Sequence, residues 1–256
     1  MARNEQFQAL VGRIAQVALG GSLPAGGPTP SAPTGCAAVG DADFAAWRDA
    51  TPLPGGDSLG AACSVGGGVV ELVGRIRENL VARRAAKLHV PGGLVVSYTH
   101  NAVAPGMGAI GVLVALAPRD PAAAPLGAGS TPGYAGLVDA ARKVAMHVAA
   151  AQPAYFSRAT VPPGALERER EVLTQQAAGS GKPAAIVAKM VDGRLGKFYA
   201  ECVLTEQPFI LADDGVRVAA WMDAAAKAAG APAVQIAGFS HFVLGQGVAA
   251  AGGEDS

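Results

Sequence analysis

Apolar side chains recur every three or four positions along several stretches of this chain, a spacing that predicts amphipathic helices. The first stretch carries Phe7, Leu10, Val11, Ile14 and Val17. Further stretches with the same period cover residues 69–88, 134–153, 162–179, 183–207 and 216–230. We therefore expect helices over these stretches.

Three other runs, 92–100, 108–118 and 233–247, are rich in β-branched and aromatic residues and predict strands. Turn-forming residues separate the first two runs, so we expect an antiparallel pair, which the third run can join. The predicted fold class is α+β, with a three-stranded antiparallel sheet and helices packed on one face. The stretches 162–179 and 183–207, joined by "GSGKP", predict an antiparallel helical hairpin.

Residues 20–66 contain few large apolar side chains and are crowded with Gly, Pro, Ala, Ser and Thr. Such a segment gains too little from burial to offset the entropy lost on ordering. We expect a flexible connector there, apart from a possible helical turn near "DFAAWRDA".

The composition excludes several classes of protein. Half of the 256 residues are apolar, and twenty Lys plus Arg balance twenty Asp plus Glu, so the net charge attracts neither nucleic acid nor anionic lipid. No apolar run approaches the roughly 20 residues that span a bilayer. Cys36, Cys63 and Cys202 lie far apart, which argues against a zinc site or a disulfide framework.

Motifs that suggest chemistry have poor contexts here. "GMGAIG" at 106–111 has the letters of a dinucleotide fingerprint but opens a predicted strand rather than a helix. His147 and His241 lie on apolar elements, which favours satisfied structural histidines, and His100 at a strand end is more open. An enzyme would need His100 or His241 beside a carboxylate in a closed pocket, so we expect no catalytic residue, cofactor or metal.

The ungapped run "SGKPAAIVAKMVDGRLGKFYAECVLTEQPFI", 180–210, closely resembles translation elongation factor Ts. "RIRENLVARRAAKL", "SYTH" with "IGVLVAL", and "KVAMHVAAAQPAYF" resemble the same family, in the family's order. "APGMGAIG" and "LEREREVLTQQAAGSGKP" look most like its mitochondrial form in plants and green algae.

The resemblance implies a guanine-nucleotide exchange factor that makes and breaks no covalent bond. Its implied partner is elongation factor Tu, in the GDP-bound and nucleotide-free states. The chain would bind it in a 1:1 complex or as a homodimer. The resemblance implies no direct contact with nucleic acid or with a membrane. The implied location is the mitochondrial matrix, with plastid stroma or bacterial cytoplasm as alternatives. The functional alternative is a structural or ribosome-associated protein that kept the fold and lost exchange.

By the same resemblance, residues 1–90 form a shortened N subdomain that includes the connector. Residues 91–248 form a C subdomain with a hairpin at 163–203 projecting from it, and 249–256 form a tail. The family has "VARNEQF" where this chain opens "MARNEQF", just after an Asp-Phe pair that wedges into the partner. We therefore expect a truncated N-terminus, weak to moderate partner binding and poor exchange.

The resemblance carries partner contacts over to a small set of positions. These are Arg3, Asn4, Ile76, Arg77, His100, Ile210 and Leu211. The family usually has Gly at the position of Arg77, which puts that contact in question. A shortened N subdomain should also expose apolar side chains, for which Val11, Ile14, Leu72 and Ile76 are the candidates.

Overall fold

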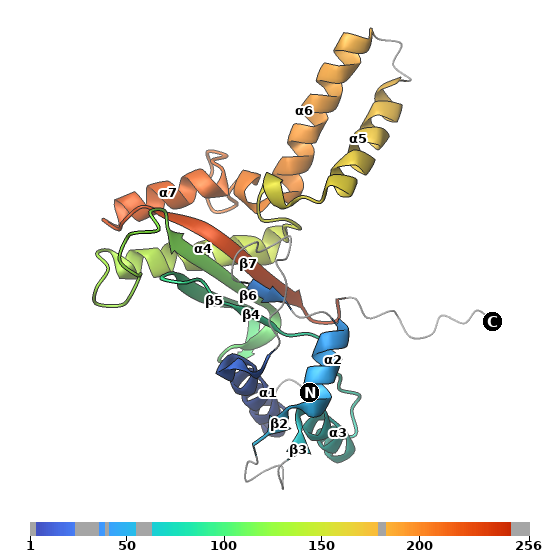
Figure 1. Cartoon of the computed structure of the whole chain (residues 1–256), viewed down its shortest axis with the longest axis vertical. Helices are drawn as coiled ribbons and strands as arrows, with labels where there is room; N and C mark the ends of the chain where they lie inside the picture. Colours follow the sequence, from blue (N-terminus) through green and yellow to red (C-terminus); the bar gives the residue numbers. More distant parts are fainter. Residues whose placement is uncertain (1–3, 24–35, 39–40, 55–62, 179–182, 247–256) are drawn as a thin grey trace, which may run out of the picture.

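The computed structural model describes residues 4–23, 36–38, 41–54, 63–178 and 183–246. Its centre is a sheet in the order β5-β6-β7, formed by β5 (Leu94–Ala104), β6 (Met107–Pro118) and β7 (Val234–Val243). Both strand pairs are antiparallel. Two helices, α4 (Tyr134–Ala151) and α7 (Val218–Ala228), pack on this sheet (Figure 1). The predicted α+β class and the predicted three-stranded antiparallel sheet are confirmed.

The main core lies between the sheet and these two helices. Alternate residues of β6, Val112, Val114 and Leu116, face Leu137 and Val144 of α4, as the twofold period of a strand requires. The intervening residues face the other side of the sheet, where Ala115 packs with Leu88. Both faces of the central strand are therefore covered.

The β5–β6 hairpin extends further into its connection than the sequence predicted. Both strands continue to a tight turn at Pro105 and Gly106, where Gly106 has φ 73°, a backbone conformation that costs glycine little. The "GMGAIG" run thus forms the turn and the start of β6. This agrees with the expectation that it opens a strand.

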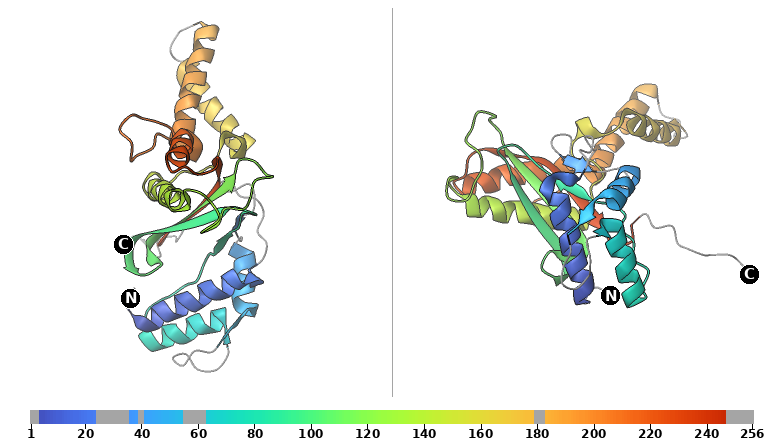
Figure 2. Two further views of the ribbon diagram at one scale, coloured as in Figure 1. Left: turned by 90° about the vertical axis from the view of Figure 1, so that its left-hand side faces the viewer. Right: turned by 60° about the horizontal axis from the view of Figure 1, so that its bottom comes forward.

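A helical hairpin projects from the sheet layer (Figure 2). It consists of α5 (Pro163–Ala178) and α6 (Ala184–Cys202), which pack through Leu173, Ala177, Val191 and Leu195. Helix α6 ends earlier than the pattern predicted, and Leu204–Glu206 form a separate 3-10 turn, η3. An earlier 3-10 turn, η2, covers Arg158–Thr160. Residues 179–182 of the expected "GSGKP" turn lie outside the described residues.

A smaller unit, which we call the N-terminal body, lies beside the sheet. It contains α1 (Glu5–Val17), the π-helical turn η1 (Ala18–Ser22), α2 (Asp41–Ala50), β2 (Pro52–Leu53), β3 (Cys63–Ser64) and α3 (Val65–Ile76). Its core is built on Leu10, Phe44, Trp47, Leu53 and Leu72. Helix α2 is longer than the single turn expected in the 20–66 connector, because Phe44 and Trp47 supply buried apolar surface. The connector residues 24–35, 39–40 and 55–62 lie outside the described residues.

The single helix expected at 69–88 is wrong in its second half. Helix α3 ends at Ile76, and Arg77 adopts a left-handed conformation with φ 55°. The chain then runs without helical structure to β4 (Ala86–Leu88), which pairs with β1 (Cys36–Ala38). Leu80, Ala82 and Ala85 pack back onto the N-terminal core, so the apolar residues of this segment are buried without forming a helix.

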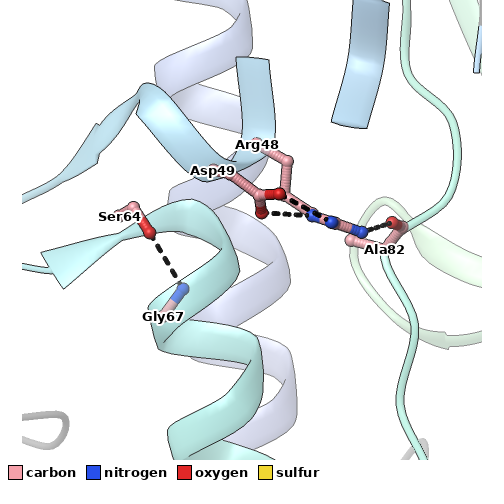
Figure 3. Close-up of polar contacts among 5 residues, drawn as sticks. All are labelled: Arg48, Asp49, Ser64, Gly67 and Ala82. Atoms are coloured by element: carbon pink, nitrogen blue, oxygen red, sulfur yellow. Dashed lines mark hydrogen bonds and ion pairs between the residues drawn. The ribbon is translucent and has the colours of Figure 1, made fainter. Parts of the chain in front are cut away.

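Two polar contacts fix this segment and the start of α3 (Figure 3). The Arg48 guanidinium holds both carboxylate oxygens of Asp49, at 2.8 and 3.0 Å, and donates to the carbonyl oxygen of Ala82 at 3.5 Å. The hydrogen bond from Arg48, aided by its charge, lowers the pKa of the Asp49 carboxyl. Ser64 caps α3 by accepting the Gly67 N–H at 3.0 Å.

Within the described ranges, no helix is both long enough and apolar enough to cross a membrane.

Candidate partner-binding surface

The most exposed apolar pair among the predicted contacts is Ile210 and Leu211, in the segment between η3 and α7. Their side chains are 50% and 49% exposed, whereas the preceding residue, Phe209, is 1% exposed. The chain therefore buries one large apolar side chain and presents the next two to solvent. Exposed apolar side chains on an anchored segment are typical of protein contact sites.

Phe209 is the anchor of this segment. Its ring packs against Trp221 of α7, with the ring centroids 4.0 Å apart. Its backbone N–H donates to the Val216 carbonyl at 2.8 Å, and its carbonyl accepts the Ala212 N–H at 3.1 Å. The backbone on either side of the exposed pair is thus held by a hydrogen bond to Val216, just before α7, and by a local turn.

His147 of α4 lies directly beneath the pair and is fully buried. Its Nε2 is 2.9 Å from Oε1 of Gln207, and its Nδ1 accepts the backbone N–H of Ile210 at 3.3 Å. Burial is the main influence on this ring and lowers its pKa, although the Gln207 hydrogen bond acts in the opposite direction. His147 is therefore a satisfied core histidine, as the sequence indicated.

His100 lies on β5, and its side chain is solvent-exposed. Its Nδ1 is 3.1 Å from the hydroxyl oxygen of Tyr98, two residues earlier on the same strand. Tyr98 is itself partly buried against the main core. One ring nitrogen of His100 is thus hydrogen-bonded within its own strand, and among the residues that the structure describes none bonds to the other nitrogen.

Ile76 and Arg77 are neighbours with different surroundings. Ile76 is the last residue of α3 and packs, partly buried, against the N-terminal core. Arg77 is exposed and occupies the left-handed position after the helix, its N–H bonded to the Val73 carbonyl. This backbone conformation favours glycine, which accounts for the residue that the family resemblance led us to expect at this position.

Asn4 is the N-cap of α1, and its side-chain oxygen accepts the Phe7 N–H at 3.1 Å. A capping role explains this residue without any partner. Arg3 lies outside the described residues. The structure thus places the described contact candidates on separate elements. These are the N-terminal end of α1, the C-terminal end of α3, strand β5, and the segment before α7.

An apolar groove of about 680 Å³ separates the N-terminal body from the sheet, and the sequence did not predict it. Val11 and Ile14 line it, as does Val81, which is 62% exposed. Leu72, which we expected to be exposed, is fully buried, because it faces the α1–α3 core. The residue that the sequence analysis overlooked is Val81, an apolar residue in the non-helical segment that follows α3.

His241 and His100 have different surroundings. Burial is the largest influence on His241 and lowers its pKa, and the positive charge of Arg84 acts in the same direction. The neighbour of His100 is a tyrosine rather than a carboxylate. Among the residues that the structure describes, no three His, Cys, Asp or Glu side chains group as metal ligands would.

Comparison with known proteins agrees with the fold. The family model described as "Elongation factor TS" matches residues 57–246. Elongation factor Ts of Rhodospirillum rubrum is 42% identical over 249 residues, which cover 97% of this chain and 68% of that protein. Those of Paramagnetospirillum magneticum and Mesorhizobium japonicum are 39% and 40% identical, over 97% of this chain and 67% and 68% of their own lengths. On the extent of these matches, the chain belongs to the elongation factor Ts family.

Proposed function

We propose that this chain binds elongation factor Tu and promotes the release of GDP, so that GTP can reload. The observation that carries the proposal is the pair Ile210 and Leu211, two apolar side chains about half exposed on a segment anchored from below by Phe209. Membership of the elongation factor Ts family supports the same partner. The activity would involve differential binding and no covalent chemistry.

The physical basis of exchange is thermodynamic linkage. A partner that binds nucleotide-free elongation factor Tu more tightly than the GDP form must weaken GDP binding by the same factor. A thousandfold weakening requires about 4 kcal/mol of differential contact free energy. Burying two half-exposed apolar side chains such as Ile210 and Leu211 contributes on the order of 2 kcal/mol of binding free energy. This contact weakens GDP binding only by the amount that it is stronger in the nucleotide-free complex than in the GDP complex.

Several finer assignments belong to this proposal. His100 and the Ile76–Arg77 turn are proposed as further contacts with elongation factor Tu, and Arg3 and Asn4 as contacts beside α1. Residues 1–90 are proposed as the N subdomain, 91–248 as the C subdomain with the hairpin 163–203, and 249–256 as a tail. We propose a mitochondrial location from the plant-like and algal-like segments, although the bacterial relatives are equally compatible with a bacterial one.

The test is stopped-flow release of a fluorescent GDP analogue from elongation factor Tu, with titration of the full chain. A double variant, Ile210→Ala with Leu211→Ala, should reduce the chain's effect on GDP release by about tenfold or more, because a lost 1.4 kcal/mol is a factor of ten. The matched control is Val172→Ala with Ile186→Ala on the hairpin, where both side chains are 47% exposed. The control should leave GDP release within about twofold of the unmodified chain, since scattered surface substitutions cost little.

Affinity for nucleotide-free elongation factor Tu is measured alongside the release rate. Binding that is equally strong with and without GDP would overturn exchange and favour the structural alternative. An absence of binding would overturn the proposal as a whole. A release rate that rises with the chain and falls in the Ile210/Leu211 variant alone would support it.

A further inference from the structure

The two ring nitrogens of His147 connect three elements of the fold. The ring projects from α4, Nε2 meets the Gln207 side chain just after η3, and Nδ1 meets the backbone of Ile210 before α7. The ring also packs on Phe209, with centroids 5.6 Å apart. A buried polar ring in this place is costly unless both nitrogens have partners, and both do.

The chemistry of the neighbours fixes which nitrogen carries the proton. The Gln207 side-chain nitrogen donates to the Glu201 carbonyl at 2.7 Å, so the amide oxygen of Gln207 is the atom that faces His147. An amide oxygen only accepts hydrogen bonds, so Nε2 of His147 must carry the hydrogen. Nδ1 is then left as an acceptor, and it receives the Ile210 N–H.

Gln207 cannot easily turn to reverse this arrangement. It is 3% exposed, its backbone N–H donates to Val203 at 3.0 Å, and its backbone carbonyl accepts the Val218 N–H at 3.0 Å. The end of α6 and the start of α7 therefore hold Gln207, Gln207 sets the tautomer of His147, and His147 holds the backbone of Ile210.

We infer that His147 is a positioning residue for the partner-binding pair: it fixes the backbone of Ile210 so that the Ile210 and Leu211 side chains are presented to elongation factor Tu in one orientation. The inference rests on the proposed function for the identity of the partner. His147 is itself fully buried and is covered by the segment it holds. Its effect on binding is therefore indirect.

Two substitutions separate the two hydrogen bonds of the ring. In His147→Asn the side-chain oxygen can stand near the position of Nδ1 and accept the Ile210 N–H, and the link to Gln207 is lost. In His147→Gln a side-chain N–H can reach toward Gln207, and the acceptor for Ile210 is lost. Because the inference depends on the Nδ1 acceptor, His147→Gln should lower affinity for elongation factor Tu about tenfold, and His147→Asn by no more than about threefold.

The direct readout is hydrogen exchange at the Ile210 amide in the full chain without partner. Its protection should fall about tenfold or more in His147→Gln and change less in His147→Asn. In a background that already carries Ile210→Ala and Leu211→Ala, His147→Gln should cause no further loss of affinity, because it acts through that pair. Equal loss of affinity in both variants, or unchanged Ile210 protection in His147→Gln, would overturn the inference.

A third measurement does not need the variants and remains available if they fold poorly. The ¹⁵N chemical shifts of the His147 ring in the unmodified chain report its tautomer, and a hydrogen on Nδ1 would overturn the inference. Should the unmodified chain fail to bind elongation factor Tu while Ile210 loses protection in His147→Gln, the proposed function is overturned and the structural link from His147 to Ile210 is retained. The two failures are therefore distinguishable.

Discussion

The hydroxyl oxygen of Tyr98 lies 3.1 Å from Nδ1 of His100, two residues along the same strand, with the two ring centroids 6.2 Å apart. Residues two apart on a strand share a face, and here the earlier residue is partly buried while the later one is exposed. The tautomer of His100 decides which of the two groups donates in this hydrogen bond. In the tautomer in which the tyrosine donates, Nε2 carries the hydrogen and the outer edge of His100 presents a single N–H donor.

Removing the Tyr98 hydroxyl should therefore weaken the partner contact proposed for His100. Tyr98→Phe loses one hydrogen bond worth about 0.5–1.5 kcal/mol, and we expect affinity for elongation factor Tu to fall about two- to tenfold. The thermal midpoint should change little, since the ring still packs. Titration calorimetry measures the affinity. Tyr199→Phe on α6, which also deletes a phenol hydroxyl, is the control, and an equal loss in both variants would contradict the role given to Tyr98.

Arg77 gives a prediction about stability. Its left-handed conformation, with φ 55°, costs a non-glycine residue roughly 1–2 kcal/mol. Arg77→Gly should raise the free energy of unfolding by about 1 kcal/mol, because the relief of strain outweighs the greater flexibility of the unfolded chain. Urea unfolding checks this. Arg77→Ala removes the same charge without relieving the backbone, so stabilisation by the alanine variant as well would show that charge and not conformation is responsible.

The same residue shows why the sequence predicted α3 incorrectly. Val73, Ile76 and Leu80 keep helical spacing across Arg77, and nothing in an arginine marks a helix end as glycine would. The chain nevertheless turns there, since Leu80 packs onto the N-terminal core and Arg48 binds the Ala82 carbonyl. Tertiary contacts determine where α3 ends, and the local spacing of apolar residues contains no information about them.

The sheet was predictable because its strands are long and each is bounded by turn formers, as at Pro105 and Gly106. The site was only partly predictable. The hydrogen bond from the Ile210 backbone to His147 joins residues more than sixty positions apart. A local sequence pattern contains no information about such a pairing. Asn4 caps α1 in the structure, a role that the sequence analysis did not assign to it although asparagine is a common N-cap residue.

Close packing between α4 and α7 can be tested at Gly136. A Cβ at this position would lie 2.5 Å from the Cβ of Ala229, a rigid neighbour. Gly136→Ala should lower the free energy of unfolding by about 1–3 kcal/mol, because overpacking outweighs the better helix propensity of alanine. Chemical denaturation gives the value.

The matched substitution is Gly193→Ala in α6, where an added Cβ meets nothing within 4 Å. There the propensity gain stands alone, and we expect stabilisation of about 0.5–1 kcal/mol in the hairpin. If Gly136→Ala were also stabilising, α4 and α7 would have to be further apart than described here.

The lowered pKa values of His147 and His241 predict how stability depends on pH. Burial is the first cause at both residues, so each ring takes up a proton less readily in the folded chain than at the usual histidine pKa of 6.5. As pH falls through 6.5, the unfolded chain binds protons before the folded chain does, so the free energy of unfolding decreases. The contribution is complete above pH 6.5 and is lost progressively below it. Asp49, whose carboxyl pKa is lowered from 3.8, acts only in a more acidic range.

Urea unfolding between pH 7.5 and 5.5 measures this dependence in the window where the histidines act. We expect a decrease in stability toward pH 5.5 in the unmodified chain and a shallower decrease in His147→Asn, which has no titrating ring at that position. His241→Asn should remove the remaining share of the slope. If other groups dominate the pH dependence, the stability curves of the unmodified chain, His147→Asn and His241→Asn will run parallel. A rise in stability toward pH 5.5 would mean that the folded chain binds more protons than the unfolded chain, contrary to the burial of both rings.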